Sequence, residues 1–456
     1  METLFPYQVE GARWLSGMDQ ALLADEMGLG KSAQAITAAD AIGAANILVI
    51  CPASVRINWE REFARFSTRA REVCVIGSAK DRVPRQGVVI CSYDLMVPLA
   101  HEFKSRQWDV LILDEAHYLK ERTAKRTKAV YGRGARYPGI ERSAARVWRL
   151  TGTPAPNNAS ELWTHLKSAG VVSDPYWDFT FRYCAGFESN YGYKITGIKN
   201  VDELKGLLAK CMLRRKKEDV MTELPPIRWQ EVTVARSQVE LDPHFFEQIQ
   251  GKRLTVDQFY DDLKTADQTL RNSLTAVSGS GTPNEDRLGI LSSMAPSLVT
   301  LRRFIGLAKL PACLDVIEEE LKEGRIDKIV LFAVHQSVIE SARVRLAKYG
   351  AVTLYGGTPL AKRQKNIDRF MNDKTCRVFI GNVVAAGTGI TLTAAHEVAF
   401  LEQDWVPANN AQASMRCHRI GQTKPVRVRV FSLHQSVDEQ VQQTLLRKSR
   451  ELTKIL

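Results

Sequence analysis

Short, continuously apolar runs recur along the chain with helical stretches between them, and they fall into two series. The first comprises Ile47–Cys51, Val88–Cys91, Val110–Leu113 and Val147–Leu150, and the second comprises Ile329–Phe332, Val352–Tyr355, Val378–Ile380 and Val398–Leu401. Runs this short, without polar alternation, are typical of strands buried on both faces. Strands that alternate with helices predict parallel, doubly wound sheets, so we expect an α/β fold with two similar lobes.

A segment of different character separates the two series. From about Ser237 to Leu310 the sequence is polar and helical in pattern, and its small-residue stretch Ser278–Arg287 is typical of a loop or hinge. We therefore predict an N-terminal lobe at residues 1–236, a helical linker or insertion at 237–310 and a C-terminal lobe at 311–456. The length of 456 residues fits two or three domains better than one core.

Composition narrows the class of protein. Hydrophobic residues make up 45% of the chain, enough for packed cores, yet no apolar run is long enough to cross a membrane. The N-terminal residues lack a basic start followed by an apolar stretch, so no secretion signal is expected. The eight cysteines include no C-x-x-C pair, which argues against a zinc ribbon and fits a reducing compartment. We expect a soluble, cytoplasmic protein associated with a nucleoid, with the nucleus as the alternative.

A glycine-rich turn carries the first candidate chemistry. Met27-Gly28-Leu29-Gly30-Lys31-Ser32 precedes a helical pattern, and such a turn presents backbone N–H groups to phosphates. Lys31 would neutralise the β- and γ-phosphates of a nucleotide, and the Ser32 hydroxyl would bind Mg²⁺. Asp25 stands where the general phosphate-loop pattern has glycine. An ordinary glycine turn is therefore the alternative if this motif is taken alone.

An acidic pair supplies the second half of that site. Asp114 and Glu115 follow the apolar run that ends at Leu113, and open α/β sheets bind ligands at the carboxyl ends of their strands. Asp114 is placed to hold Mg²⁺, and Glu115 to orient or deprotonate an attacking water. The alternative without a function is a solvated acidic turn. The order of the glycine-rich turn and the acidic pair, and the position of each after its element, disfavour it.

The second lobe offers positive charge for a phosphoryl transition state. Arg416 and Arg419 lie three residues apart, so on a helix they would share one face and could act as arginine fingers. Without the motifs of the first lobe, a basic helix face would be the simpler interpretation.

Taken together, these motifs resemble a known family. DEMGLGKS, ICPASVRINWERE, SYD, DEAH, LTGTP, LRRKKEDV, AAGTGITLTAA and RCHRIGQ occur in the order of the Swi/Snf-type branch of the superfamily-two ATPases. The resemblance covers nearly the whole chain, and Asp25 is normal for that branch. It implies two RecA-like lobes, ATP and Mg²⁺ in the cleft between them, and translocation along duplex DNA, usually without strand separation.

The resemblance also assigns roles to individual residues. Gln8 matches the adenine-contacting glutamine, and Gly387 and Gly389 match a motif that lines the cleft from the second lobe. The stretch Phe181–Ala185, with LRRKKEDVMTELPP after it, resembles the annealing-helicase or fork-remodelling branch. The basic run Arg214–Lys217 could be mistaken for a nuclear-import signal, but the family has it as part of the fold.

The resemblance also implies DNA contacts at motifs that face the DNA track. They would be contacts to the DNA backbone, with little base readout. The expected contact residues are Pro52, Ser54, Arg56, Ser92, Tyr93, Thr153, Gly356, Gly357, Thr358 and Thr388. Trp405 is either a residue that couples the DNA and ATP sites or a core tryptophan.

The surplus of positive charge is concentrated in one stretch. The chain carries a net charge of +12, and residues 120–149 contain ten basic and two acidic residues. Within this stretch, Arg133, Arg136 and Arg142 lie in or beside a Gly, Arg and Tyr-rich loop at residues 131–142. A mobile basic loop could supply phosphate contacts to DNA, although a solvated insertion explains the composition equally well.

The sequence therefore predicts a monomeric, ATP-driven motor that acts on double-stranded or branched DNA and on no membrane. Two other classes stay open at this stage. One is a clamp that binds ATP and DNA but hardly hydrolyses ATP, against which the intact Glu115 and both arginines argue. The other is an RNA helicase, or a DNA helicase that separates strands, from the same superfamily.

Overall fold

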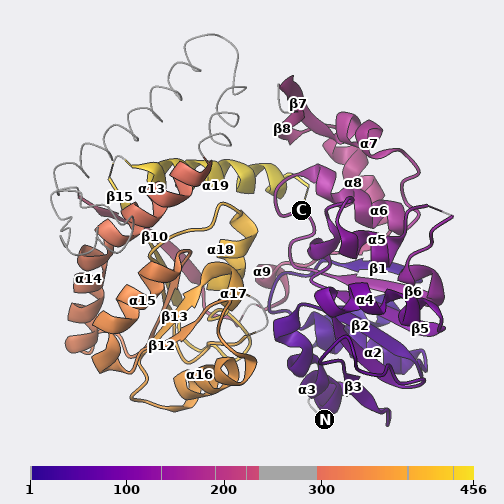
Figure 1. Cartoon of the computed structure of the whole chain (residues 1–456), viewed down its shortest axis with the longest axis horizontal. Helices are drawn as coiled ribbons and strands as arrows, with labels where there is room; N and C mark the ends of the chain where they lie inside the picture. Colours follow the sequence, from indigo (N-terminus) through magenta and orange to yellow (C-terminus); the bar gives the residue numbers. More distant parts are fainter. Residues whose placement is uncertain are drawn as a thin grey trace.

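The computed structural model describes residues 3–134, 136–189, 192–221, 223–235, 295–387, 390–434 and 436–455. Two α/β lobes lie side by side, the first in indigo to magenta and the second in orange to yellow (Figure 1). Each lobe is built on one sheet whose strands all run parallel. This confirms the predicted α/β class with two doubly wound lobes.

The first sheet contains every strand predicted for the N-terminal lobe. Its strand order is β3-β4-β2-β5-β6-β1-β9. In that order the strands are Val73–Val75, Val88–Ser92, Ile47–Cys51, Trp108–Asp114, Ala144–Leu150, Gln20–Leu23 and Met212–Leu213. The helices of this lobe are α1 (Pro6–Ser16), α2 (Lys31–Ala41), α3 (Arg56–Phe66), α4 (Tyr93–Lys104), α5 (Lys125–Tyr131), α6 (Trp163–Ser168), α7 (Tyr176–Tyr183), α8 (Val201–Ala209) and α9 (Lys217–Val220).

The second sheet has the order β10-β15-β14-β11-β13-β12. In that order its strands are Ile227–Val234, Val426–Leu433, Glu397–Phe400, Ile329–Ala333, Val378–Asn382 and Val352–Leu354. Its helices are α13 (Ala295–Ala308), α14 (Leu310–Lys322), α15 (Gln336–Arg345), α16 (Leu360–Asn372), α17 (Val383–Ala386), α18 (Pro407–Ser414) and α19 (Val437–Thr453).

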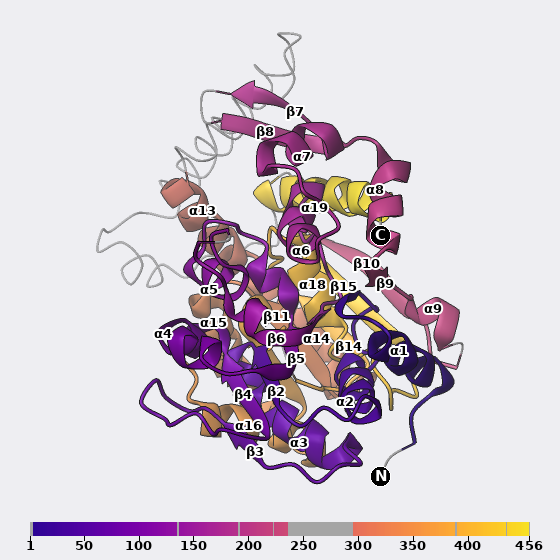
Figure 2. The ribbon, with the colours of Figure 1, turned by 90° about the vertical axis from the view of Figure 1, so that its right-hand side faces the viewer.

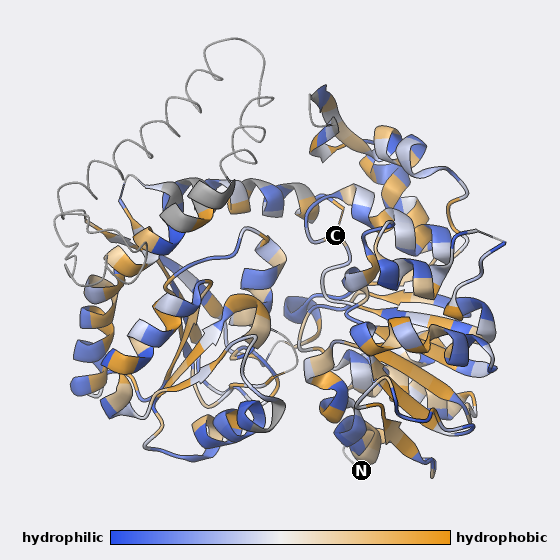
Figure 3. Cartoon of the chain, viewed as in Figure 1, coloured by the Kyte–Doolittle hydropathy of each residue, from blue (hydrophilic) through white to orange (hydrophobic). Residues whose placement is uncertain are grey.

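Alternate residues of one strand enter different cores, which explains the apolar runs. On β2, Val49 belongs to the cluster on one face of the sheet, while Leu48 and Ile50 belong to the cluster on the other. The second sheet behaves alike, with Leu331 on one face and Val330 on the other. Helices cover both faces, so the central strands are apolar throughout while the outer helix surfaces are polar (Figure 3). None of the helices in the described ranges combines the length and apolarity needed to cross a bilayer.

The lobe boundary differs from the predicted one at residue 236. Strand β10 falls within the range predicted for the first lobe, but it pairs in parallel with β15 along the edge of the second sheet. Helix α13 falls within the predicted linker, yet Ile305 and Leu307 enter the core of the second lobe. The chain therefore enters the second lobe at Ile227. The remainder of the predicted linker, residues 237–294, lies outside the described residues.

Two further features were not predicted. Strands β7 (Cys184–Ser189) and β8 (Gly192–Ile198) form an antiparallel hairpin, which projects from the first lobe beside α7 (Figure 2). At the other end of the chain, α19 crosses from the second lobe towards the first (Figure 1). Leu452 in its last turn and Ile455, just after the helix, pack with the core cluster of α6, α7 and α8. The C-terminus thus joins the two lobes.

Candidate functional site

The glycine-rich turn connects β1 to α2 at the carboxyl end of the first sheet. Gly28 and Gly30 have φ angles of 89° and 70°, the left-handed region that side chains with a Cβ rarely adopt. Gly30 is also the N-cap of α2, and a Cβ added there would lie 2.3 Å from Nε2 of Gln8. Two glycines are thus required to turn the chain directly into a helix N-terminus, where N–H groups are available to an anion.

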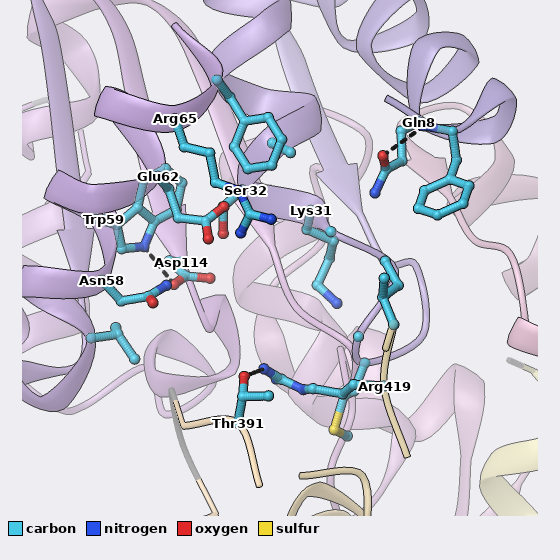
Figure 4. Close-up of a pocket in the computed structure, with 18 of the residues that line it drawn as sticks. Gln8, Lys31, Ser32, Asn58, Trp59, Glu62, Arg65, Asp114, Thr391 and Arg419 are labelled. Atoms are coloured by element: carbon cyan, nitrogen blue, oxygen red, sulfur yellow. Dashed lines mark hydrogen bonds between the residues drawn. The ribbon is translucent and has the colours of Figure 1, made fainter. Parts of the chain in front are cut away.

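A cavity of about 340 Å³ opens over this turn. Its lining comes from both lobes and includes Met27, Gly28, Gly30, Lys31, Ser32, Asp114 and Glu115 from the first and Thr391, Arg416 and Arg419 from the second. Lys31 and Ser32 lie on one side of the cavity and Arg419 on another (Figure 4). The structure therefore brings together the phosphate loop, the acidic pair and both arginines that the sequence predicted separately.

Lys31 is held by backbone carbonyls rather than by a carboxylate. Its Nζ donates to the carbonyl oxygens of Asp25 at 2.7 Å and Glu26 at 3.3 Å. Burial lowers the pKa of Lys31, while the carboxylates of Glu115, Asp25 and Asp114 act in the opposite direction. Since no carboxylate of the described residues lies within ion-pair distance of Nζ, the buried ammonium is well suited to an anionic ligand.

Asp25 has a structural role that explains the departure from the general phosphate-loop pattern. Its side chain is fully buried and accepts hydrogen bonds from Arg215, through Nε at 3.0 Å and a terminal nitrogen at 2.5 Å. It also accepts from the backbone N–H of Arg215 at 3.1 Å and from Nε2 of Gln34 at 3.1 Å. The carboxylate that replaces glycine thus fastens the loop to a segment that lies far away in sequence.

Asp114 ends β5 and points into the cavity (Figure 4). The indole Nε1 of Trp59, on α3, donates to its Oδ2 at 2.8 Å. Tyr93 donates its hydroxyl hydrogen to the Asp114 carbonyl at 2.8 Å. Burial and then the adjacent Glu115 raise the pKa of Asp114, while the Trp59 indole and Lys31 act in the opposite direction.

Glu115 occupies a sparsely populated backbone conformation, with a φ angle of 49°. Burial would raise the pKa of Glu115, but the hydrogen bond and charge of His117, followed by Lys31 and Arg416, lower it overall. His117 lies 3.3 Å from Oε2 of Glu115, and its Nδ1 lies 3.0 Å from Oγ1 of Thr151. His117 therefore links the carboxylate to the turn after β6. Glu115 stays ionised and can accept a proton.

The two arginines come from the second lobe, on the loop that follows α18. The Arg416 guanidinium donates to the carbonyl oxygens of Gly387 and Ile390, and Arg419 donates to Oγ1 of Thr391 at 3.2 Å. Within the described ranges, Nε of both arginines is buried without a hydrogen-bond partner, and no carboxylate lies within salt-bridge distance of either. Burial and then Arg419 lower the pKa of Arg416, so an anion between them would relieve the repulsion.

These features fit a nucleoside triphosphate with Mg²⁺. Lys31, Arg416 and Arg419 surround one cavity without a paired carboxylate in the described part of the chain, and together they complement a polyanion. The Ser32 hydroxyl and the Asp114 carboxylate line the same cavity, and oxygen donors are the ligands that Mg²⁺ prefers. Ser32 and Asp114 would therefore hold the ion.

Gln8 also lines the cavity, as expected for an adenine-contacting residue. It is buried at the start of α1, where its Oε1 accepts from the Phe5 N–H at 3.0 Å and its Nε2 donates to the Leu29 carbonyl at 3.2 Å. Leu29 itself is fully buried and supplies no cavity surface. Gly387 contributes its carbonyl to Arg416 rather than a cavity wall. Thr388 and Gly389 lie outside the described residues.

Sequence reasoning missed the contribution of α3. Asn58, Trp59, Glu62 and Arg65 line the cavity from this helix (Figure 4). Their spacing places them on one helical face, and the motif ICPASVRINWERE contains three of them. That spacing was the available signal, because polar residues on a face with a tryptophan are unusual for a surface helix.

The residues expected to contact DNA fall into two groups. The first group is buried, with side chains that form hydrogen bonds inside the protein: Ser92, Tyr93, Arg56 and Thr358. The Tyr93 hydroxyl donates to the Asp114 carbonyl, and the Thr358 hydroxyl accepts from the Tyr355 N–H. Pro52 is also buried, and Ser54 and Thr153 are half-buried, whereas Gly356 and Gly357 are exposed. Because these side chains are buried, only the backbone groups of the first group could contact a DNA phosphate. That contact stays a prediction. Trp405 is half-buried, with the Arg302 guanidinium 4.9 Å from its ring centroid.

The basic stretch is partly structural. Arg149 is fully buried and donates to Gln20 at 3.1 Å, Lys120 pairs with Glu161 at 2.7 Å, and Arg146 donates to the Ser16 carbonyl at 2.7 Å. Arg133, Arg136 and Arg142 are exposed. The loop that carries them is bonded internally, with the Arg133 N–H donating to the Tyr137 carbonyl at 2.8 Å. Only part of the surplus charge is therefore available to a ligand.

Residues 7–276 match the SNF2-related domain family, and residues 310–421 match the helicase conserved C-terminal domain. A SWI/SNF-related matrix-associated actin-dependent regulator of chromatin subfamily A-like protein 1 homolog of Caenorhabditis elegans is 31% identical over 452 residues, or 96% of this chain and 60% of that protein. A DNA annealing helicase and endonuclease of Mus musculus is 28% identical over 464 residues, or 98% of this chain and 40% of that protein.

The chain thus spans about half the length of the curated relatives it matches. Among solved structures, the Sulfolobus solfataricus SWI2/SNF2 ATPase core in complex with dsDNA aligns over 100% of this chain and 97% of that one. Its sequence is 24% identical, and the TM-score is 0.45.

Proposed function

Because this chain belongs to the SNF2-related family, we propose that it is a DNA-dependent ATPase that hydrolyses ATP between its lobes and uses the energy to move along duplex DNA or remodel it. One cavity joins the phosphate loop, the acidic pair and both arginines, and this convergence supports hydrolysis over mere binding. One chain supplies both halves of the site. We therefore propose that a single chain is sufficient for turnover and that the motor is a monomer.

The residues divide the work of hydrolysis. The N–H groups at the start of α2 and Lys31 bind the β- and γ-phosphates, and Gln8 contacts the base. Ser32 and Asp114 would hold Mg²⁺, which would supply positive charge to the phosphate oxygens. Glu115 orients the attacking water and accepts its proton, and His117 holds that carboxylate in place. Arg416 and Arg419 stabilise the charge of the transition state from the second lobe.

The placement of the site between lobes supports its use as a motor. The arginines reach the phosphates only when the lobes are close, so binding and hydrolysis would change the spacing between the lobes. DNA is proposed as the track because the exposed basic loop and the exposed turn at Gly356 offer sequence-independent contacts. The name of one relative, a DNA annealing helicase and endonuclease, supports DNA as the substrate, and we propose branched DNA as the preferred form.

A comparison of polynucleotides tests the proposal. ATP turnover would be measured with duplex DNA, single-stranded DNA, duplex RNA, model forks and four-way junctions, each at equal nucleotide concentration. Stimulation by duplex DNA or by forks and junctions is expected. Stimulation by RNA alone would favour an RNA helicase, and binding without turnover would favour a clamp.

The Arg419→Ala variant tests whether this arginine acts in ATP hydrolysis or in DNA binding. Because the arginine approaches from the second lobe, DNA-stimulated kcat should fall by on the order of 10³-fold while ATP affinity changes little. Arg416→Ala should behave alike. An Arg419 variant with normal kcat but weakened DNA binding would instead place that residue on the track.

A further inference from the structure

The basic run Arg214–Lys217 and the residues after it lie between the two halves of the site. We call residues 214–221 and 223–225 the bridging segment. It continues from β9 of the first sheet, includes α9, and leads into β10 of the second sheet. It is therefore the covalent path from one lobe to the other.

The start of the bridging segment is fastened to the phosphate loop. Arg214 donates to the Ala24 carbonyl at 2.9 Å, and Arg215 holds the buried Asp25 carboxylate. The N–H of Lys217 donates to Oε2 of Glu26 at 2.8 Å. Three consecutive residues before the turn, Ala24 to Glu26, thus have a partner in this segment.

The same segment also grips the loop that carries the arginine fingers. Nζ of Lys217 donates to the His418 carbonyl at 2.7 Å and lies 3.0 Å from the Met415 sulfur. Nε2 of His418 lies 2.7 Å from the Pro225 carbonyl oxygen. A carbonyl only accepts, so Nε2 carries the hydrogen. His418 stands between Arg416 and Arg419, and it is therefore held at its backbone and at its ring.

The surroundings of Lys217 show that its position has an energetic cost. The residue is 4% exposed, and burial lowers its pKa to about 7. Glu26 opposes that shift, while Arg419, Lys31 and Arg416 add to it. A Cβ on Gly28 would lie 3.3 Å from Cε of Lys217 and 3.3 Å from Cγ of Arg419. Lys217 thus occupies the contact point between the phosphate loop and the finger loop.

We propose that Lys217 is a positioning residue that ties the arginine-finger loop of the second lobe to the phosphate loop of the first, so that the occupied site and the fingers assemble together. This role rests on the proposed ATPase function, but the tether itself does not. Lys217 lines no part of the cavity, so it acts on the reaction through the fingers rather than on the nucleotide.

Hydrogen exchange tests the tether without any turnover. Lys217→Met keeps the aliphatic stem and removes the donor, and the neighbouring Lys216→Met is the matched control because Lys216 is exposed. Backbone amides of residues 415–422 should lose roughly tenfold protection in the Lys217 variant and none in the control. Unchanged protection in the Lys217 variant would overturn the proposal.

Kinetics test what the tether does. In Lys217→Met, DNA-stimulated kcat should fall on the order of 10- to 100-fold while ATP affinity, measured by direct binding, changes less than about threefold. His418→Ala removes the hydrogen bond from the His418 ring to the Pro225 carbonyl without changing a contact to the phosphate loop. It should also lower kcat while ATP affinity stays nearly unchanged, and it provides the test if Lys217→Met folds poorly. A parallel loss of ATP affinity and kcat would overturn the finger-positioning role and assign Lys217 to the phosphate loop.

The two proposals fail in different ways. A wild-type protein that hydrolyses no ATP with any polynucleotide contradicts the proposed function, while the exchange experiment still decides the tether. A wild-type protein with DNA-stimulated turnover that Lys217→Met leaves within twofold, by contrast, overturns the positioning role alone.

Discussion

Two adjacent carboxylates in this site experience opposite electrostatic environments. Asp114 accepts from the Trp59 indole, but burial and the neighbouring Glu115 raise its pKa. Glu115 lies beside His117 and is close to Lys31, and together they lower its pKa. The proposed proton acceptor, Glu115, is thereby kept ionised, whereas burial disfavours the ionised form of Asp114, the proposed Mg²⁺ ligand. Neighbouring positions in the sequence thus suit the different roles that we propose for them because their contacts differ.

The proposed roles of Lys31 and Glu115 predict that substitutions of the two residues change ATP binding and turnover differently. Lys31→Ala removes a phosphate contact and should weaken ATP binding as well as turnover. Glu115→Gln should keep ATP bound and lower kcat by 10²- to 10⁴-fold, in the range of general-base loss. Equilibrium nucleotide binding and steady-state turnover separate the two. A Glu115→Gln protein with more than about a tenth of wild-type turnover would show that another group activates the water.

Asp25 allows a test with an internal control, because Arg215 contacts two carboxylates. The Asp25 side chain is fully buried, and its Oδ2 lies 2.5 Å from a terminal nitrogen of Arg215. Oε2 of Glu10 lies 4.0 Å from the other terminal nitrogen, on a side chain that is 72% exposed. Asp25→Ala leaves a largely buried guanidinium without its buried carboxylate and should lower the free energy of unfolding by about 3–5 kcal/mol. Glu10→Ala should cost less than about 1 kcal/mol. Denaturant titrations measure both, and equal losses would mean that the buried pair does not hold the loop.

At the scale of elements, the predictable parts were those with a strong apolar pattern. Strands such as β2 and β11 are buried on both faces, and every residue of them is apolar. Strand β10, with the sequence IRWQEVTV, lies at a sheet edge and is only half apolar, so its pattern does not identify the sheet it joins. The hairpin β7–β8 packs on its own lobe without entering either sheet, and no period in the sequence marks it.

The site was predictable for a related reason. Its phosphate loop and acidic pair are contiguous in sequence, and each follows a recognisable strand. The contributions of Trp59 and Lys217 depend on contacts between distant segments, Trp59 to Asp114 and Lys217 to His418. Contacts at such separations leave no local pattern in a single sequence. The same applies to Arg215, whose partner Asp25 looked like a departure from a motif.

Helices α5 and α6 enclose a histidine that should make stability depend on pH. His165 is buried, its Nδ1 lies 3.1 Å from the Tyr131 hydroxyl, and burial lowers its pKa from 6.5 to about 3. Between these values the unfolded chain binds a proton that the folded chain does not. Stability should therefore fall as pH drops below 6.5, by up to about 1.4 kcal/mol per pH unit.

Urea unfolding between about pH 7.5 and pH 5.5 measures this dependence. His165→Gln should flatten the acid side of the profile, even if the variant is less stable at neutral pH. His101→Gln, at an exposed histidine of α4, should leave the slope unchanged. Parallel profiles for wild type and His165→Gln would contradict a neutral, buried imidazole.

At the scale of the molecule, three connections hold the lobes together. The bridging segment carries the chain from one sheet to the other, and the loop with Arg416 and Arg419 meets the phosphate loop. The third connection is the return to the first lobe by the end of α19, at Leu452, and by Ile455 just after it. The last of these connections lies away from the cavity. Relative motion of the lobes must therefore bend or slide a packed C-terminal helix as well as open the nucleotide site.

Charge is distributed unevenly over this two-lobed shape. Several basic residues of the 120–149 stretch are committed to the fold, as Arg149 and Lys120 show. Arg133, Arg136 and Arg142 are exposed, and the Arg136 guanidinium lies 5.7 Å from the ring centroid of Tyr137, which is itself 59% exposed. An internally bonded loop that presents cations and an aromatic ring is suited to a polyanion with no fixed sequence.

If that loop contacts DNA, replacing Arg133, Arg136 and Arg142 with alanine should weaken binding equally for all sequences. For every DNA phosphate that the variant no longer neutralises, the plot of log K against log salt should also become flatter by about 0.9 for duplex DNA. ATP turnover without DNA should not change, because none of the three residues lines the cavity. A matched control removes three exposed charges of the second lobe, Lys322, Arg343 and Lys374, and should leave the salt slope near wild type. Wild-type affinity and slope in the loop variant would instead mean that the exposed arginines only solvate the surface, and that the track lies along the turns at Gly356 and Thr153.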